Sequence, residues 1–198
     1  ISFVFLLDTY SHFVPKFKSC HTKYVGIFVF QNATIPPSMD KLTKEEKIDI
    51  VLHKGVSEIL PSKAFVETAL MGSKKLSIYA GFDPTATTLH IGHVIQLRKL
   101  RQFQDLGHKI IFLIGDFTAR IGDPDKLSVR KPLTEKEIKT NLKLYKKQAS
   151  KFIVFGGKNP AKVMFNNKWL GKMKFADVLN LASQMTVDQM LKRDMFVK

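Results

Sequence analysis

Residues 76–114 have the sequence LSIYAGFDPTATTLHIGHVIQLRKLRQFQDLGHKIIFLI, and this stretch decides the fold. Residues 76–82 predict a short strand that runs into a polar turn. Residues 91–106 have the spacing of an amphipathic helix closed by Gly107, and residues 109–114 are a continuous apolar run typical of a buried parallel strand. A strand, a helix and a strand with short connections form a right-handed βαβ unit. We therefore expect an α/β protein with an open parallel sheet.

Capping pairs and apolar periodicity predict further helices and strands on both sides of this unit. They are a helix from Thr43 to Pro61 with Ile48, Leu52, Val56 and Ile59 at helical spacing, a helix from Ser62 to near Gly72, a helix from Thr134 to about Phe152, a strand over 163–165, and a helix over 175–185 with Val178, Leu179 and Leu181 facing inward. The parallel sheet is thus preceded by two helices.

Composition excludes several classes of protein. The chain has 198 residues, of which 44% are hydrophobic and 25% charged, so it can bury a core and is neither disordered nor collagen-like. Cys20 is the only cysteine and no Cys/His cluster has metal-ligand spacing, so we expect no bound metal ion and a reducing, cytoplasmic location. The net charge of +15 favours a polyanionic partner or a solvated basic surface.

Residues 1–38 differ from the remainder of the chain. They contain six of the sixteen phenylalanines and no capping pattern, whereas Met39 begins a stretch typical of a natural protein start. We interpret residues 1–38 as upstream or non-native sequence; the alternative is a genuine extension. The apolar opening at residues 1–7 is too short to span a bilayer and has no basic residues before it, so we expect no membrane segment.

The candidate chemistry lies in residues 79–93, at the carboxyl edge of the predicted sheet, where open α/β folds bind ligands. Thr85 offers a hydroxyl group, and the spacing of His90 and His93 places both imidazoles on one side of the beginning helix. Gly92 leaves room for a flat base or a ribose. Free N–H groups at the helix N-terminus would suit a phosphate.

Residues 81–86 (GFDPTA) and 89–93 (LHIGH) closely resemble the signature of class I aminoacyl-tRNA synthetases, in the form found in bacterial-type tyrosyl-tRNA synthetases. The resemblance continues through residues 101–108, 115–124 and 166–169. It covers roughly residues 41–198 and implies a Rossmann-like open parallel sheet, of which the chain would hold the first half. Residues 39–198 would then be an incomplete catalytic, nucleotide-binding domain, inactive alone, with the second signature loop and the anticodon-binding domain beyond them.

The resemblance implies a two-step reaction in which tyrosine attacks the α-phosphate of ATP, supplied with Mg²⁺, and the adenylate then acylates tRNA(Tyr). It makes Thr85, His90 and His93 the catalytic residues, with Thr85 and His90 at the transferring phosphates. His93 and Gly92 match positions that hold the adenosine, and Asp83 matches a position beside the nucleotide.

The resemblance also implies a tyrosine site. Tyr79 matches the residue that contacts the substrate phenol, and Thr118 and Asp123 match residues that bind its ammonium group. Asn166 is a further candidate for this tyrosine site. The alternatives are a core aromatic for Tyr79 and a turn residue for Asp123.

Departures from the family pattern leave some assignments open. Ala80 stands where some members have a cysteine that reaches the ribose, and Asp125-Lys126 replaces the usual Ser-Gly. The stretch to Arg130 and Lys131 is one residue shorter than the family pattern, so either residue is a candidate for pyrophosphate or tRNA.

The function that the resemblance implies is that of a tyrosine–tRNA ligase, acting on tyrosine, ATP and tRNA(Tyr) as a homodimer when whole. Two other classes are weighed against it. One is a small H-x-G-H nucleotidyltransferase that adenylylates a small molecule without tRNA. The other is a basic RNA-binding module derived from a synthetase and lacking catalysis.

Overall fold

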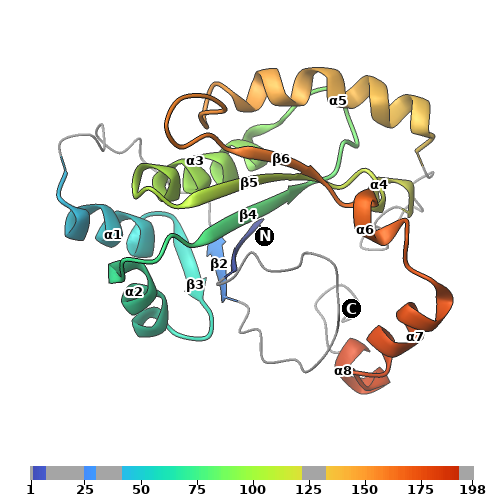
Figure 1. The fold of residues 1–198 in the computed structure, drawn as a ribbon, viewed down its shortest axis with the longest axis horizontal. Helices are drawn as coiled ribbons and strands as arrows, with labels where there is room; N and C mark the ends of the chain where they lie inside the picture. The colour runs from blue at the N-terminus through green and yellow to red at the C-terminus, as the bar shows by residue number, and fades with distance from the viewer. Residues whose placement is uncertain (1, 8–24, 30–41, 122–132, 192–198) are drawn as a thin grey trace.

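The computed structural model describes residues 2–7, 25–29, 42–121 and 133–191. Their six strands form one sheet in the order β3-β2-β1-β4-β5-β6 (Figure 1). The strands are β1 (Ser2–Leu7), β2 (Val25–Val29), β3 (Val56–Ile59), β4 (Ser77–Phe82), β5 (Lys109–Ile114) and β6 (Lys162–Phe165). The helices are α1 (Lys44–His53), α2 (Lys63–Met71), α3 (Ile91–Asp105), α4 (Thr118–Ile121), α5 (Glu135–Ala149), α6 (Asn167–Leu170), α7 (Phe175–Ala182) and α8 (Val187–Leu191).

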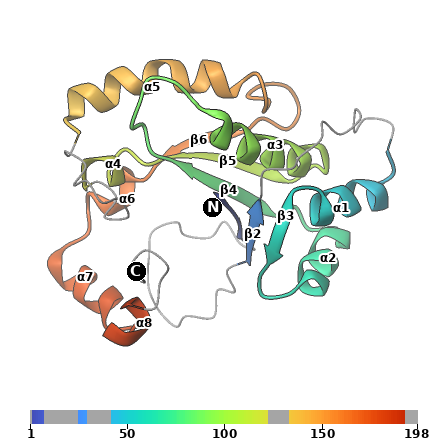
Figure 2. The same cartoon turned by 180° about the vertical axis from the view of Figure 1, so that it is seen from behind.

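The predicted βαβ unit is confirmed and continues into a second one. β4, β5 and β6 are parallel: Ile78 pairs with Ile110, and Phe112 pairs with Val163. α3 connects β4 to β5, and α5 belongs to the connection from β5 to β6. Figures 1 and 2 show both helices on the same face of the parallel strands. The α/β class is therefore as expected, and the parallel part of the sheet consists of β4, β5 and β6.

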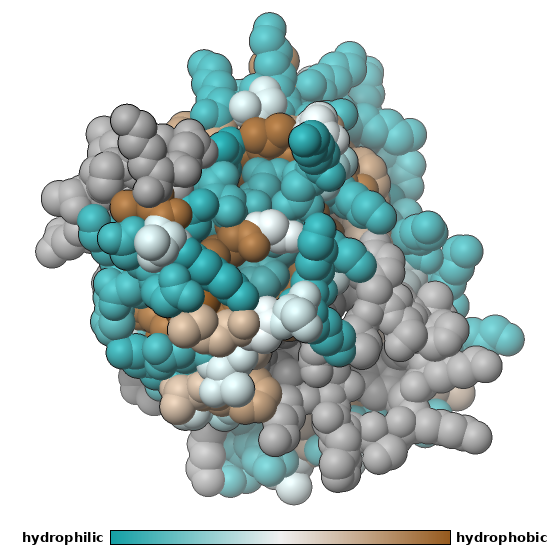
Figure 3. Space-filling model, turned by 60° about the vertical axis from the view of Figure 1, so that its left-hand side comes forward, coloured by the Kyte–Doolittle hydropathy of each residue, from teal (hydrophilic) through white to brown (hydrophobic). Residues whose placement is uncertain are grey.

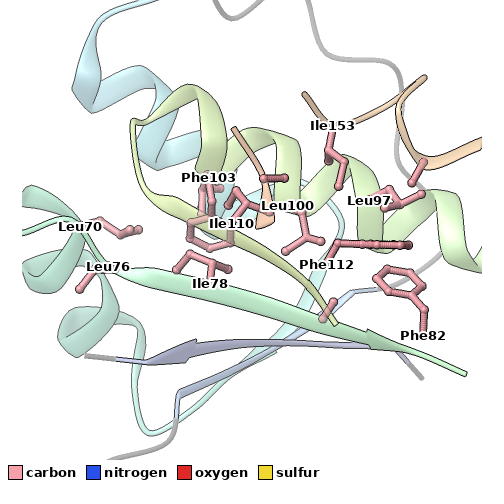
Figure 4. Close-up of a cluster of buried hydrophobic side chains, with 14 of the residues drawn as sticks. Leu70, Leu76, Ile78, Phe82, Leu97, Leu100, Phe103, Ile110, Phe112 and Ile153 are labelled. Carbon is pink, nitrogen blue, oxygen red and sulfur yellow. The ribbon is translucent and has the colours of Figure 1, made fainter. Parts of the chain in front are cut away.

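The main core fills the space between this face and the helices. Ile78, Ala80 and Phe82 alternate along β4 and are at most 1% exposed. They pack with Leu97 and Phe103 of α3 in one cluster (Figure 4). Complete burial of a large apolar side chain contributes about 1.5–3 kcal/mol. This alternation fixes which face of β4 is left for a ligand.

The helix expected from Thr43 is shorter than predicted. Its capping box forms as predicted, but α1 ends at His53, and Gly55 has φ of 68°. Val56–Ile59 is a strand that pairs antiparallel with β2. The positive φ of Gly55 stops the helix before the next apolar residues, whose spacing had suggested a helix.

Residues 1–38 supply two strands to the sheet. β1 pairs antiparallel with β2 and with β4, where Phe5 lies opposite Tyr79. The described part of this segment thus extends the sheet from the edge of β4 that β5 does not occupy. Its interpretation as upstream or non-native sequence stays a prediction.

The predicted inward face of α7 is wrong. Val178, Leu179 and Leu181 are 47%, 53% and 41% exposed. The periodicity located the helix, but in this structure its apolar side chains are not packed into a core. The helix from Thr134 is also shorter than expected: α5 ends at Ala149, whose carbonyl accepts from Phe152 N at 2.9 Å in the following turn.

Two further features concern the surface. Figure 3 shows one side of the molecule, where hydrophilic side chains predominate and hydrophobic ones lie between them, in keeping with the net charge of +15. None of the helices in the described residues combines the length and apolar character needed to cross a membrane.

Candidate functional site

The candidate site lies where β4 and β5 end. Tyr79 and Gly81 alternate with the buried residues of β4 and therefore point to the face opposite the α3 core. Tyr79 is half-buried and Gly81 is exposed. A Cβ added to Gly81 would meet nothing within 4 Å, so a ligand could approach the backbone there.

A chain of three polar side chains joins the ends of three parallel strands. Thr118 Oγ1 donates to Asp83 Oδ1 at 2.7 Å, and Asn166 Nδ2 donates to Thr118 Oγ1 at 3.0 Å. Asp83 follows β4, Thr118 begins α4 after β5, and Asn166 follows β6. The structure thus brings together three residues that the resemblance had assigned separately to the nucleotide and to tyrosine.

The backbone around this chain is tightly fitted. Asn166 is only 7% exposed, and its Oδ1 accepts from Phe117 N at 2.8 Å. A Cβ at Gly115 would overlap Asp83 Oδ1 and Thr118 Oγ1. Gly115 is therefore required so that the end of β5 can lie against Asp83, a role that sequence reasoning missed.

His90 and His93 form a reciprocal cap at the start of α3. His90 Nδ1 accepts from Gly92 N at 3.1 Å, and His93 Nδ1 accepts from His90 N at 3.1 Å. The two rings stack with their centroids 3.8 Å apart. The prediction that both imidazoles lie on one side of the helix start is confirmed.

The caps fix the chemistry of the two rings. Because each Nδ1 accepts a hydrogen bond from a backbone N–H, the bonding pattern assigns the ring proton to Nε2 in both histidines. Burial and the neighbouring His90 lower the pKa of His93 from 6.5 to about 4, so His93 is neutral at pH 7. Each ring can then donate through Nε2.

One expectation about this helix end is corrected. The N–H of Gly92 is bonded to His90 rather than free for a phosphate, because the imidazole takes the place of a capping hydroxyl group. A Cβ at Gly92 would lie 3.0 Å from His90 Cε1. Gly92 therefore leaves room for the His90 ring itself.

The loop between Asp83 and His90 rests on α5. Asn141 Nδ2 donates to Pro84 O at 2.8 Å, and Gln148 Nε2 donates to Thr87 O at 2.9 Å. Tyr145 of the same helix reaches this loop as well. Sequence reasoning missed these α5 side chains, although their spacing of four and three residues places them on one helix face.

The structure describes one of the remaining expected site residues, Thr85, but not the other three. Thr85 is exposed in this loop, and its N–H donates to Asp83 O at 2.8 Å. Asp123, Arg130 and Lys131 lie outside the described residues. Across the described ranges, no three His, Cys, Asp or Glu side chains gather in a way that could hold a metal ion.

Comparison with models of protein families gives a match that spans these residues. The family described as tRNA synthetases class I (W and Y) matches residues 71–198, which include the whole described site.

Curated relatives are tyrosine–tRNA ligases. That of Moorella thermoacetica is 46% identical over 152 residues, covering 75% of this chain and 36% of the relative. That of Idiomarina loihiensis is 47% identical over 150 residues, covering 74% and 36%. The chain therefore spans little more than a third of the length of these relatives.

Solved structures agree on the fold. The C-terminally truncated mitochondrial tyrosyl-tRNA synthetase of Coccidioides posadasii superposes with a TM-score of 0.59 at 26% identity, covering 79% of this chain and 44% of that one. The enzyme of Aspergillus nidulans gives a TM-score of 0.62 at 24% identity, covering 79% and 46%. Since the family match takes in well over half of the chain and the named relatives are tyrosyl enzymes, the chain belongs to the class I tRNA synthetases, in their tyrosyl-tRNA synthetase group.

Proposed function

We propose that the protein is a tyrosine–tRNA ligase, which activates tyrosine with ATP and transfers it to tRNA(Tyr). The observation that carries this proposal is the chain from Asp83 through Thr118 to Asn166, at the same sheet edge as the His90–His93 pair. A polar site for an amino acid beside imidazole donors for phosphate is the combination that adenylate formation needs. Residues 39–198 would form part of the catalytic domain.

The two histidines would act as neutral donors. His90 Nε2 and the Thr85 hydroxyl would hydrogen-bond the phosphate oxygens as negative charge shifts toward pyrophosphate. His93 would donate to the adenosine, with Gly92 allowing the close ring packing and Asp83 beside the nucleotide. Because both Nδ1 atoms are engaged by backbone N–H groups, each ring is held in one tautomer before substrate arrives.

The tyrosine site would lie on the open face of β4. Tyr79 would contact the substrate phenol from the middle of the strand, where Gly81 leaves the surface open. Thr118 and Asp123 would bind the ammonium group, for which a carboxylate is the strongest partner, and Asn166 would belong to the same tyrosine site. Thr118 donates to Asp83 and accepts from Asn166, so its hydroxyl oxygen has one lone pair left for a donor such as an ammonium.

Other parts of the proposal concern the substrates and the assembly. Mg²⁺ would enter on ATP, since this ion is commonly held through the substrate phosphates with few protein ligands. Arg130 or Lys131 would meet pyrophosphate or tRNA. We further propose that the whole protein is a homodimer and acts in the cytoplasm.

The test is amino-acid-dependent incorporation of labelled pyrophosphate into ATP by the whole protein. Tyrosine should support it, whereas tryptophan and phenylalanine should not. Support by tryptophan alone would indicate a tryptophan-activating enzyme of the same family. Absence of incorporation with any of the three amino acids would favour a nucleotidyltransferase, which transfers the adenylyl group to a different acceptor. Attachment of tyrosine to tRNA(Tyr) then tests the second step.

The role of His90 can be separated from its role as a helix cap. His90→Asn retains a capping acceptor but loses Nε2, whereas His90→Ala loses both. Both variants should lower the rate of pyrophosphate incorporation about a hundredfold, or ~3 kcal/mol, with little change in tyrosine affinity. His53→Ala is a matched control, since His53 pairs with Asp49 on α1. A normal rate in His90→Asn would assign His90 to capping alone.

A further inference from the structure

Three polar side chains of α5 bind the backbone of the loop that joins β4 to α3. We call Asn141, Tyr145 and Gln148 the α5 stripe. They lie four and three residues apart, so they share one face of the helix. Several exposed lysines lie on the rest of α5, including Lys136, Lys139, Lys143 and Lys147.

The stripe engages successive backbone groups of the loop. Asn141 Nδ2 donates to Pro84 O at 2.8 Å, and Tyr145 Oη donates to Asp83 O at 3.4 Å. Gln148 bridges two positions, because its Nε2 donates to Thr87 O at 2.9 Å and its Oε1 accepts from Leu89 N at 2.8 Å. Backbone groups from residue 83 to residue 89 are therefore bonded to one helix.

The α5 stripe holds the middle of the loop, and other contacts hold its two ends. At its start, the Asp83 side chain accepts from Thr118, and at its end His90 is the cap of α3. Between these ends the backbone has no helix or strand to satisfy its polar groups. Tyr145 is 1% exposed and belongs to the main core, so the stripe ties the loop to a rigid element.

We propose that the α5 stripe is a set of positioning residues for adenylate formation, which hold Thr85 and His90 in place without touching substrate. The inference rests on the proposed function for its catalytic meaning, but the placement of the loop can be measured independently. Displacing a reacting group by about 1 Å can cost about a hundredfold in rate. Weakening the stripe should therefore lower kcat more than it changes the KM for tyrosine.

The test uses variants that keep the shape of the side chain and remove the hydrogen-bond donor. Asn141→Asp and Gln148→Glu replace an N–H donor by a carboxylate oxygen facing the carbonyls of Pro84 and Thr87. Thr140→Asp is the matched control, since it adds the same charge to α5 at a position where the hydroxyl donates to the Lys136 carbonyl of its own helix. Tyr145→Phe removes one hydroxyl and keeps the buried ring, so it remains informative if the charged variants do not fold.

Two measurements are made on the whole protein: hydrogen–deuterium exchange of the backbone amides of residues 85–90, and kcat and KM for tyrosine-dependent pyrophosphate incorporation. We expect loop amides to exchange about tenfold faster, and kcat to fall about tenfold to a hundredfold, in the stripe variants but not in Thr140→Asp. Loop amides that exchange as slowly as in the control would overturn the positioning role. Faster loop exchange in a protein whose native form lacks tyrosine-dependent activity would uphold the role and reject the proposed function.

Discussion

Helix α5 was expected from the capping pair at Thr134 and Glu137, and helix α7 from its apolar residues at helical spacing, yet the two helices have different surroundings. In α5, Ile138, Tyr145 and Ala149 are at most 3% exposed. In α7, Phe175 is 76% exposed and Leu179 is 53% exposed. Periodicity therefore shows that a helix has an apolar face, while burial of that face depends on the surface the chain presents to it.

Topology explains the difference. α5 lies in the connection between the parallel strands β5 and β6, and a right-handed crossover places such a helix on the sheet. α7 comes after β6 and α6, and in the described residues no strand follows it. The comparison therefore predicts large effects of substitution where a helix is part of a crossover and small effects where it is not.

The largest effect is expected for Tyr145→Ala in α5. Loss of this buried ring should lower the free energy of unfolding by about 3–5 kcal/mol, because the surroundings cannot close the cavity completely. Urea unfolding followed by circular dichroism would measure it. Leu144→Ala is the neighbouring control, since Leu144 is 47% exposed and should change stability by less than about 0.5 kcal/mol. Equal losses in the two variants would break the comparison.

Much of the structure around the parallel strands β4, β5 and β6 was predictable, because local and tertiary preferences agree there. The capping box at Thr134 and Glu137 forms as predicted, and β5 has the predicted bounds at residues 109–114. In contrast, Val56 and Ile59 fitted a helical spacing and lie in a strand, since Gly55 ends α1 and β2 offers a partner. Whether a short apolar segment forms a helix or a strand depends on the segment that it pairs with, and periodicity alone does not identify that partner.

The resemblance named candidate site residues one by one, but it did not predict how they are arranged. The resemblance named Asp83 for the nucleotide and Thr118 and Asn166 for tyrosine, whereas their mutual hydrogen bonds require three strand ends to meet. The contacts of Asn141 and Gln148 with the loop span 57 and 61 residues of sequence. Such long-range polar contacts have no local signal, so only the fold reveals them.

A pair of glycines extends the contrast between packed and open surroundings. Gly115→Ala should lower the free energy of unfolding by about 1–3 kcal/mol and weaken tyrosine binding, because the new Cβ displaces Asp83 and Thr118. Gly81→Ala, on the open face of β4, should change stability by less than about 1 kcal/mol. Chemical denaturation and tyrosine titration measure both. A Gly115→Ala variant with unchanged stability and unchanged tyrosine affinity would mean that the end of β5 does not lie against Asp83.

The helix caps provide a smaller version of the same comparison. Thr134→Ala removes the hydroxyl that accepts from Glu137 N at the start of α5, which should cost about 1 kcal/mol. Thr186 accepts from Gln189 N in the same way at the start of α8, where Val187 and Leu191 are exposed. Thr186→Ala should therefore affect global unfolding less than Thr134→Ala, as differential scanning fluorimetry would show. The reverse order would indicate that α8 unfolds together with the core.

The smallest effect is expected for Leu179→Ala in α7. A leucine that is 53% exposed has already kept much of its apolar area in water, so its removal forfeits little hydrophobic stabilisation. The free energy of unfolding should fall by less than about 0.5 kcal/mol, close to the value for exposed Leu144 in α5 and far from that for Tyr145. Urea unfolding of the three variants in parallel makes the comparison direct. A loss of about 2 kcal/mol or more in Leu179→Ala would show that this side chain is packed in an interface in solution. The two helices would then differ in what covers their apolar faces, and not in whether those faces are covered.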